Sequence, residues 1–184
     1  NCNVSTSPKL DKATMPGDDD PCDNPAVYRT VVCKQIYFVK RRPDCQSTVR
    51  WLCKHLKDPT QKSWRQLVKL LHYQKGTIDL ATRFPKEGVA DRIDGLLDSD
   101  WGSCEIDRKS VAGGAIMVGG CRTHSHSRGM TDHSLSSGEA EFYASGKACA
   151  HLLFLVYLVR EMGTKVVGSL RSDSSAGRGI MGRT

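Results

Sequence analysis

The sequence Ser136-Ser137-Gly138-Glu139 has the pattern of a helix start, and the helix that follows constrains the fold more than any other feature. Ser136 is the predicted N-cap, and Glu139 is placed to reach back and complete a capping box. The helix runs to about Met162, where Gly163 can adopt the left-handed conformation that ends helices. Its apolar run at 152–159 is far shorter than the roughly 20 residues that cross a bilayer. We therefore predict a core helix and no transmembrane segment.

Apolar segments on both sides of this helix have the length and composition of strands. They lie at 93–98 and 114–119, with a weaker one within 121–135, and at 165–172 after the helix. Strands followed by a long helix and a further strand indicate a sheet covered by helices, of the α/β or α+β type. The second half of the chain is therefore predicted to be an α/β domain.

Helical periodicity marks the region from 28 to 76. Apolar residues repeat at i, i+3, i+4 and i+7 from Val49 to Leu56, and the same spacing returns from Trp64 to Leu71. Asp58-Pro59 offers an N-cap followed by proline at the first helical position, and Gly76 offers a C-terminal stop. The region is predicted to form two or three basic amphipathic helices.

Positive charge is concentrated in the same region. The formal net charge is +7, and residues 29–75 hold twelve Lys and Arg against two Asp. Dense basic segments bind phosphates because each neutralised phosphate releases condensed counterions. A solvated helical face explains the charge equally well. The candidate nucleic-acid-binding residues are Lys40, Arg41, Arg42, Arg50, Lys54, Lys62, Arg65 and Lys69.

Residues 1–27 have the composition of a linker. They hold four of the seven prolines and little apolar periodicity, so we expect this segment to be poorly ordered unless contacts hold it. The segment also contains the triplet Asp18-Asp19-Asp20. Paired aspartates occur in polymerase active sites, but no strand pattern surrounds this triplet. An exposed acidic turn is the better interpretation.

Eight cysteines are spread along the chain without any Cys-x-x-Cys pair. Zinc sites normally contain such a pair, and secreted disulfide scaffolds are shorter and richer in cysteine. We therefore expect most of these cysteines to be small buried hydrophobic residues in a reducing compartment, the cytoplasm or the nucleus.

Three acidic residues occupy positions where carboxylates can converge. Asp98 follows an apolar strand, Glu141 lies in the first turn of the capped helix, and Asp173 ends the last predicted strand. Side chains at strand ends and at a helix start can meet at one edge of a sheet. Two Mg²⁺ ions require such a cluster, because they prefer oxygen ligands and their charge offsets the repulsion between carboxylates. From spacing alone, three unrelated surface acids are the favoured alternative.

Ordered blocks of residues resemble copia-type retrotransposon polyproteins from about Tyr28 to the end of the chain. The first blocks are similar to the end of the reverse transcriptase: Tyr28-Arg29, Arg42-Pro43-Asp44, Pro59-Thr60, Trp64, His72-Tyr73 and Lys75-Gly76-Thr77. The later blocks are similar to the ribonuclease H domain that follows it: Asp98-Ser99-Asp100-Trp101, Asp107-Arg108-Lys109-Ser110, Gly113-Gly114, Leu135-Ser136-Ser137-Gly138-Glu139-Ala140-Glu141 and Ser172-Asp173-Ser174-Ser175-Ala176. The block that ends at Glu141 is the most specific.

The resemblance implies an RNase H-like mixed sheet with helices over 88–184, preceded at 28–87 by a basic helical segment similar to the reverse-transcriptase thumb and connection. It also implies that Asp98, Glu141 and Asp173 are catalytic and bind two Mg²⁺ ions. The implied reaction is hydrolysis of the RNA strand in RNA–DNA hybrids.

Four further positions match the same family pattern. Asp100 is expected to be a neighbour of the acidic site, and Glu139 is expected to be the capping residue. Trp101 is expected in the core, and Lys109 is expected to be a surface base.

Several positions depart from the family pattern. Cys33 stands where glycine is usual, His124 stands where tryptophan is usual, and the usual glutamine is missing from 122–128. His124 and His126 invite a ligand role, but a degraded strand is the better interpretation. The chain ends at Thr184, before the family's final motif, so we expect a truncated domain with weak or absent catalysis.

Three functions are compatible with this sequence. The first is a fragment of a retrotransposon reverse transcriptase and ribonuclease H. The second is a catalytically dead remnant that acts as a structural or interaction subunit, and the third is a simple nucleic-acid-binding module. The expected partners are an RNA–DNA hybrid or other nucleic acid, and the rest of the polyprotein or a larger protein assembly.

Overall fold

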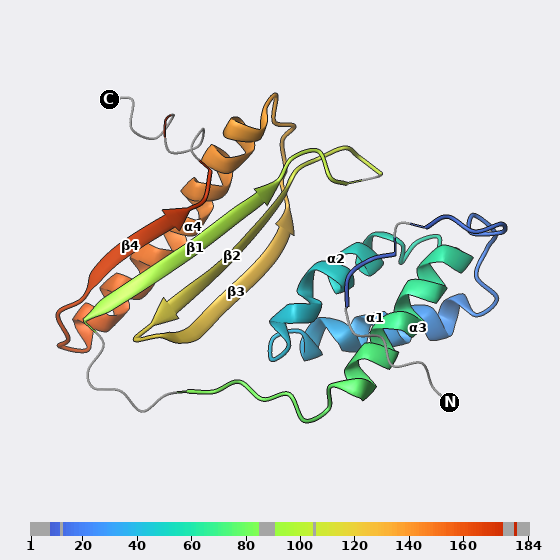
Figure 1. The fold of residues 1–184 in the computed structure, drawn as a ribbon, viewed down its shortest axis with the longest axis horizontal. Helices are drawn as coiled ribbons and strands as arrows, with labels where there is room; N and C mark the ends of the chain where they lie inside the picture. Colours follow the sequence, from blue (N-terminus) through green and yellow to red (C-terminus); the bar gives the residue numbers. More distant parts are fainter. Residues whose placement is uncertain (1–7, 12, 85–90, 105, 175–178, 180–184) are drawn as a thin grey trace. The chain divides into compact units, whose positions relative to one another are not determined.

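A computed structural model describes residues 8–11, 13–84, 91–104, 106–174 and 179. The chain forms two compact units, Asn1–Thr82 and Arg83–Thr184, called unit 1 and unit 2 below (Figure 1). The boundary predicted between residues 87 and 88 lies outside the described residues.

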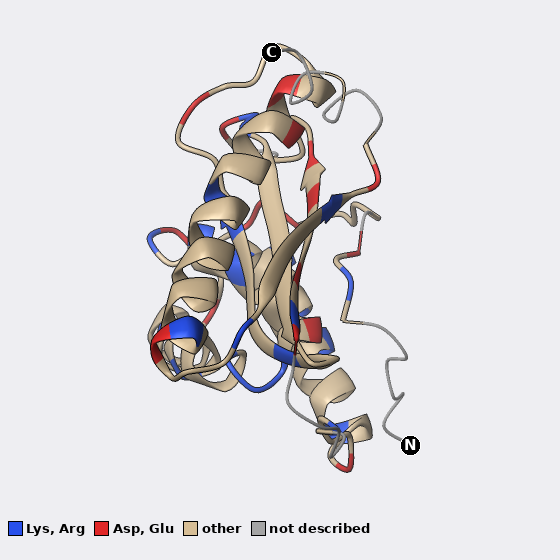
Figure 2. Cartoon of the chain, turned by 90° about the vertical axis from the view of Figure 1, so that its left-hand side faces the viewer, with Lys and Arg blue, Asp and Glu red and all other residues tan. Residues whose placement is uncertain are grey.

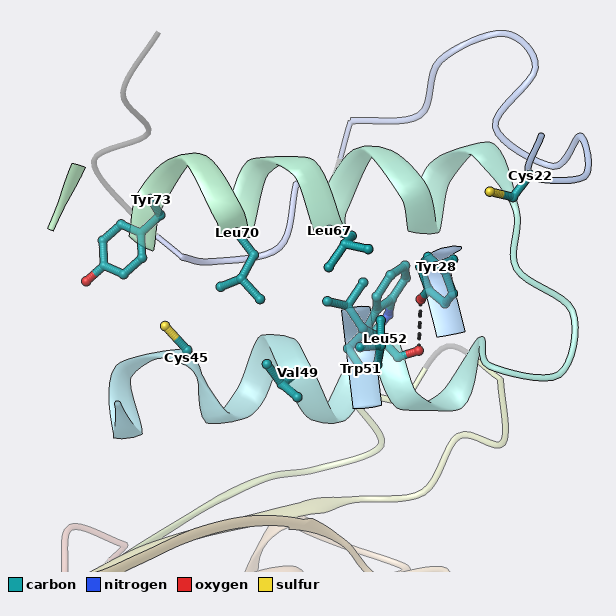
Figure 3. Close-up of a cluster of buried hydrophobic side chains, with 10 residues drawn as sticks. Cys22, Tyr28, Cys45, Val49, Trp51, Leu52, Leu67, Leu70 and Tyr73 are labelled. Carbon is teal, nitrogen blue, oxygen red and sulfur yellow. Dashed lines mark hydrogen bonds between the residues drawn. The ribbon is translucent and has the colours of Figure 1, made fainter. Parts of the chain in front are cut away.

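Unit 1 is built from three α-helices, as its periodicity predicts: α1 (Pro25–Phe38), α2 (Gln46–Lys54) and α3 (Gln61–Gly76). A short 3₁₀ helix, Pro43–Cys45, precedes α2. Their apolar faces meet in one core (Figure 3). The buried residues of this core are Cys22, Tyr28, Val32, Cys45, Val49, Trp51, Leu52, Leu67, Leu70 and Tyr73.

Tyr28 ties α1 to α2 inside this core. Its side chain is completely buried, and its hydroxyl donates a hydrogen bond of 2.9 Å to the carbonyl oxygen of Leu52, drawn as a dashed line in Figure 3. Burial raises the pKa of Tyr28 to about 12, because the charged form would lose its hydration. The hydrogen bond satisfies the buried hydroxyl group, as core tyrosines require.

The start of α3 differs from the prediction by two residues. The N-cap is Thr60 rather than Asp58. The side chain of Thr60 accepts a hydrogen bond from the Ser63 backbone N–H, and the Ser63 hydroxyl oxygen accepts one from the Thr60 N–H at 2.9 Å. This reciprocal capping box satisfies two backbone donors that a helix start leaves without partners.

The segment before α1 is held against the helices by several contacts. Asp18 is buried and forms an ion pair with Arg65 of α3, so the expectation of a fully exposed acidic turn is wrong at this residue. The Gln61 N–H donates to the Asp20 carbonyl oxygen, and the Cys22 N–H donates to that of Pro59, each at 2.9 Å. The described part of this segment is therefore pinned in place.

Cysteine burial is lower than the sequence predicts. Among the seven described cysteines, Cys22, Cys45 and Cys104 are buried, and Cys33 is exposed. The other three are partly buried, so the expectation that most are buried is wrong. All seven are free thiols.

Unit 2 is a mixed four-stranded sheet with one long helix, as the predicted α/β class requires (Figure 1). The strands lie in the order β3-β2-β1-β4. The pairs β1–β2 and β2–β3 are antiparallel, whereas β4 runs parallel to β1. The element bounds are Arg92–Asp100 for β1, Val111–Val118 for β2, Cys121–Gly129 for β3, Ser137–Glu161 for α4 and Val167–Ser172 for β4.

Helix α4 packs along one face of this sheet. Small residues on the helix, including Ala140, Ala144 and Ala148, contact Leu97 and Ala112 of the strands. Near the other end of α4, a second buried cluster joins helix and sheet through Ile93, Ile116, Leu152, Val156 and Val166. The helix ends as predicted, with Met162 as C-cap and Gly163 at a φ of +85°.

Gly95 of β1 leaves room for a side chain of the neighbouring strand β4. A Cβ atom at Gly95 would lie 2.8 Å from Cδ1 of Leu170, so that side chain would have to shift. The glycine therefore lets Leu152 and Leu170 pack over the β1 backbone.

The outer side of α4 is largely apolar and exposed. Phe154 and Tyr157 are 65% and 61% exposed, and Figure 2 shows few charged residues along the middle turns of the helix. By length and composition α4 is the one helix in the described ranges that could cross a membrane. That is weak support for a span, because core helices of soluble proteins meet the same criterion, and the inner side of α4 packs on the sheet.

Candidate metal centre

Three elements of unit 2 bring Asp98, Glu141 and Asp173 together. Strands β1 and β4 run parallel and pair Leu97 with Ser172, so the residues that follow, Asp98 and Asp173, occupy the same edge of the sheet. Helix α4 begins at this edge and supplies Glu141. Each of the three side chains offers a carboxylate oxygen within 4.8 Å of the other two. The structure therefore joins the three acids that the sequence marks as candidates.

Glu141 is the fixed member of this trio. It is only 4% exposed, and its Oε1 accepts hydrogen bonds from the backbone N–H and the hydroxyl of Ser99, both at 3.0 Å. Its Oε2 accepts a third from the hydroxyl of Ser172 at 3.3 Å. Buried carboxylates require such donors, and three of them hold this one between β1 and β4.

The other two carboxylates are open to solvent. Asp98 and Asp173 are both exposed, so a ligand can reach the trio from the side that they line. The site therefore has one carboxylate that hydrogen bonds hold in place and two carboxylates that solvent can reach. The sequence did not indicate that Ser99 and Ser172 bind Glu141. The one feature that could have pointed to them is that each lies next to a candidate acid in the sequence.

The start of α4 differs from the predicted capping box in one contact. The Ser136 hydroxyl accepts from the Glu139 N–H at 3.2 Å, as predicted. Glu139 Oε2, however, accepts from the Leu135 N–H at 2.6 Å. Glu139 is therefore a capping residue. Glu141 lies one step beyond the first turn, in which the acidic residue is Glu139.

The donor set of the trio fits a hard divalent cation. Within the described ranges, no Lys or Arg side chain forms an ion pair with Asp98, Glu141 or Asp173. Three carboxylates this close repel one another when ionised, and a cation between them removes that repulsion. Oxygen ligands alone suit Mg²⁺, Mn²⁺ or Ca²⁺ rather than softer metals. The trio could therefore hold a metal ion.

Asp100 and Trp101 follow Asp98 along the chain without joining the trio. Asp100 is exposed at the end of β1. Trp101 is 53% exposed, so the expected core role is wrong. Its indole N–H donates to the Ser134 carbonyl oxygen at 2.9 Å and thereby ties the end of β1 to the segment before α4. Lys109 donates to the Thr131 carbonyl oxygen.

The eight candidate nucleic-acid-binding residues all lie in unit 1, where Arg42 and Arg65 form ion pairs. Arg42 is buried, pairs with Asp44 at 2.8 Å and donates to Thr77. Arg65 pairs with Asp18. Lys40, Arg41 and Lys69 are exposed or partly buried, and Lys40 lies over the ring of Tyr37 at 5.8 Å. Arg50, Lys54 and Lys62 are partly buried.

Strand β3 is regular despite its unusual histidines. It pairs with β2 from Val111↔Gly129 to Val118↔Cys121, with one irregularity at Ile116/Met117, so the interpretation of a degraded strand is wrong for the backbone. The structure also adds a third histidine, His151 of α4, which the sequence did not indicate. The ring centroids of His124, His126 and His151 lie 5.0–5.8 Å apart.

Comparison with known proteins shows distant similarity to a retrotransposon polyprotein. The chain is 28% identical over 163 residues to the "Retrovirus-related Pol polyprotein from transposon RE2" of Arabidopsis thaliana, a match that covers 89% of this chain and 11% of that protein. It is 30% identical over 130 residues to the "Uncharacterized mitochondrial protein AtMg00810" of the same plant, a match that covers 70% of this chain and 53% of that protein.

The chain therefore spans a small part of the first relative and about half of the second. It is distantly similar to copia-type Pol polyproteins. No protein-family model matches the sequence. No solved structure matches it.

Proposed function

We propose that unit 2 is a ribonuclease H-like domain of retrotransposon origin, and that it hydrolyses the RNA strand of RNA–DNA hybrids. The observation that carries the proposal is the trio Asp98, Glu141 and Asp173, whose carboxylate oxygens lie within 4.8 Å of one another. Similarity to a Pol polyprotein over 89% of the chain supports a substrate of nucleic acid.

The residues of the trio have distinct parts in this proposal. When bound, two Mg²⁺ ions supply Lewis acidity and stabilise the charge that develops on the attacking and leaving oxygens of a phosphodiester. Asp98, Glu141 and Asp173 would hold them. Ser99 and Ser172 hold the Glu141 carboxylate in place before any ligand arrives, so its orientation costs little during the reaction. Asp98 and Asp173 face the solvent from which the hybrid approaches.

Unit 1 is proposed to contact the phosphate backbone of the same substrate. Its positive charges without a described internal ion pair, such as Arg41 and Lys69, are the best candidates. Arg42 and Arg65 are weaker candidates, because each is already bound to an aspartate. Binding through phosphates predicts an affinity that falls steeply as salt concentration rises.

A hybrid-cleavage assay with Mg²⁺ on the 184-residue chain tests this proposal. Asp98→Asn keeps the size of the side chain and removes one ligand charge, so we expect cleavage to fall by at least roughly 100-fold. Asp100→Asn is the matched control, because Asp100 lies on the same strand, is exposed and is not part of the trio. Cleavage that survives in Asp98→Asn, or that falls equally in Asp100→Asn, would contradict the assignment.

The exposed side of α4 favours a second candidate, a non-catalytic subunit of a larger assembly. Leu153, Phe154, Tyr157 and Leu158 are all large, apolar and exposed. Contiguous apolar surface of this kind commonly marks an interaction site. Metal binding at the trio without any cleavage of the hybrid, together with association that is lost in Phe154→Ser, would favour this candidate over the enzyme.

A further inference from the structure

Three histidines meet between β3 and α4, at a place where a soluble α/β domain normally has apolar contacts. His124 and His126 alternate along β3, and His151 comes from α4. The ring of His126 lies over the backbone of β2, where its Cε1 is 2.6 Å from the position that a Cβ of Gly114 would occupy. Glycine at 114 therefore makes room for this imidazole.

Two buried nitrogens of this cluster lack hydrogen-bond partners in the described structure: Nε2 of His124 and Nδ1 of His126. Burial, followed by repulsion from His124, His151, Arg128 and Lys147, lowers the pKa of His126 to about 4. Burial also lowers the pKa of His124. A buried polar atom without a hydrogen-bond partner destabilises the folded state, so such an atom calls for an explanation.

A cavity of about 270 Å³ opens beside these rings. Its polar side chains are His126, Arg128, Lys147 and His151, and Ala112, Gly129 and Ala150 complete the described wall. No carboxylate of the described residues lines it. Within the described part of the chain, neither Arg128 nor Lys147 has an ion-pair partner. The cavity thus combines two fixed positive charges with two imidazoles and lacks a negative charge.

We propose that this cavity binds a phosphate group. Arg128 and Lys147 supply the charge, and His126 and His151 supply ring N–H donors, with one residue of each kind from β3 and one of each kind from α4. The volume suits one phosphate with a few waters, because a water molecule in the liquid takes about 30 Å³. Charge-assisted hydrogen bonds from Arg and Lys to phosphate are among the strongest that a protein makes.

A transition metal fits the same histidines less well. Imidazole is a good ligand for zinc, nickel or copper. However, ligand atoms converge tightly enough for a metal only at Asp98, Glu141 and Asp173 among the described residues. Arg128 and Lys147 also face the cavity and would repel a cation. An anion is attracted by Arg128 and Lys147 and can accept hydrogen bonds from the imidazoles, whereas a metal ion is repelled by the two cations.

This site lies apart from the candidate metal centre. Lys147 and His151 follow Glu141 by six and ten residues on α4, which places them about 9 and 15 Å further along the helix axis. The proposal therefore goes beyond the proposed function and does not depend on hydrolysis. The phosphate group could belong to a nucleic-acid strand or to a small phosphorylated molecule, because both present the same anion to this lining.

Binding is expected to take up protons. The titratable and charged groups beside the imidazoles are His124, His126 and Arg128 from β3 and Lys147 and His151 from α4, while the β2 residues Ala112 and Gly114 carry no charge. An anion stabilises the imidazolium form. Affinity should therefore rise as pH falls below neutral, by up to about tenfold per pH unit for each proton taken up.

NMR titration of the 184-residue chain tests the site, with the histidine ring signals as the readout and inorganic phosphate as the probe at constant ionic strength. We expect the signals of His126 and His151 to shift together and to saturate. Sulfate, whose charge stays constant between about pH 5 and pH 8, should bind more tightly at the lower pH. A short single-stranded oligonucleotide that competes for the same signals would assign the site to a nucleic-acid strand, and phosphate binding without competition would assign it to a small molecule.

Matched variants separate this site from general attraction to a basic protein. Lys147→Gln and Arg128→Gln, one from each side of the cavity, should each weaken phosphate binding by about tenfold. Lys34→Gln makes the same charge change at an exposed residue of α1 and should leave phosphate binding unchanged. A variant is compared only if its backbone spectrum matches that of the wild type away from the cavity. Equal weakening by Lys34→Gln, unresponsive histidine signals, or stoichiometric Zn²⁺ binding by the histidines without any phosphate response would overturn the proposal.

Discussion

The two units use charged residues in opposite ways. In the described part of unit 1 the two buried charged residues are paired: Asp18 with Arg65, and Arg42 with Asp44. In unit 2 the buried Glu141 has only hydroxyl and backbone donors, and two more carboxylates lie beside it. A high density of charge marked unit 1 in the sequence, yet the three carboxylates that lie together without a described ion pair, Asp98, Glu141 and Asp173, are in unit 2. Internal pairing therefore separates structural charges from candidate ligand-binding charges better than local charge density does.

The Arg42–Asp44 pair is an example of two charged side chains that bind each other inside unit 1. Burial disfavours the ionised Asp44, but hydrogen bonds from Arg42 and Tyr73 outweigh burial and place the pKa of Asp44 below its ordinary value. The hydrogen bond that Arg42 donates to Asp44, partly opposed by burial, raises the pKa of Arg42 above its ordinary value. Arg42 also donates to the backbone and hydroxyl oxygens of Thr77, which follows α3.

The largest expected effect comes from removing a carboxylate in unit 2. Asp98→Asn should weaken Mg²⁺ binding and hybrid cleavage by at least roughly 100-fold. The same change should not lower the free energy of unfolding without metal, because it removes a like charge next to Glu141 and Asp173. Denaturant unfolding with and without Mg²⁺ measures both effects. Lower stability of the metal-free variant would show that Asp98 is a structural residue.

Removing a carboxylate in unit 1 should have the opposite result. Asp44→Asn leaves the buried Arg42 without its ion pair, and we expect a loss of about 1–3 kcal/mol in the free energy of unfolding. Mg²⁺ binding should be unchanged. Asp79→Asn is a suitable control, because Asp79 is exposed in the same unit. Equal stability of the Asp44 and Asp79 variants would contradict the claim that the paired Asp44 stabilises unit 1.

The units should also differ in the pH at which they lose stability. His126 has a folded pKa of about 4, below the value of about 6.5 in an unfolded chain, so the unfolded state binds more protons between these values and unit 2 loses stability as pH falls through this window. In unit 1, the lowered pKa values of Asp18 and Asp44 give stability that is lost only as pH falls below about 4.

Amide spectra recorded along an acid titration resolve this difference residue by residue. Signals of unit 2 should weaken at a higher pH than those of unit 1. His126→Gln should move the acid transition of unit 2 downward, whereas His133→Gln, at an exposed histidine, should not. A common transition for both units that neither variant shifts would contradict this account.

The smallest effects are expected at the helix caps, where the two units should behave alike. Thr60→Ala in α3 and Ser136→Ala in α4 each remove a side chain that accepts a hydrogen bond at a helix start. Each should cost about 1 kcal/mol of unfolding free energy. Thermal or denaturant unfolding measures both. A much larger loss for Ser136→Ala would mean that this cap also positions the trio through Glu141.

Local patterns account for the parts of the fold that were predicted correctly. The Ser136 cap, the Gly163 stop and the apolar runs of β1 and β2 depend on residues that are near in sequence. Asp98, Glu141 and Asp173 were placed together because strand ends and a helix start share an edge, and a family resemblance singled them out.

Contacts between distant residues explain what the sequence did not reveal. Asp18 lies 47 residues from Arg65, and Ser99 lies 42 residues from Glu141. His151 meets the histidines of β3 only because α4 packs on that face of the sheet. Trp101 was expected in the core, but it is half exposed and binds a backbone carbonyl group. None of these contacts leaves a periodic or spaced pattern in the sequence.

Mn²⁺ titration of the 184-residue chain, followed by amide NMR, tests the central claim most directly. Mn²⁺ shares the oxygen preference of Mg²⁺, and its unpaired electrons broaden nearby signals. We predict that low concentrations broaden Asp98, Ser99, Glu141 and Ser172 first, that Mg²⁺ reverses the effect, and that Glu141→Gln abolishes it. Broadening that begins at the Asp18-Asp19-Asp20 turn of unit 1, or that persists in Glu141→Gln, would show that the acidic trio of unit 2 is not the metal centre.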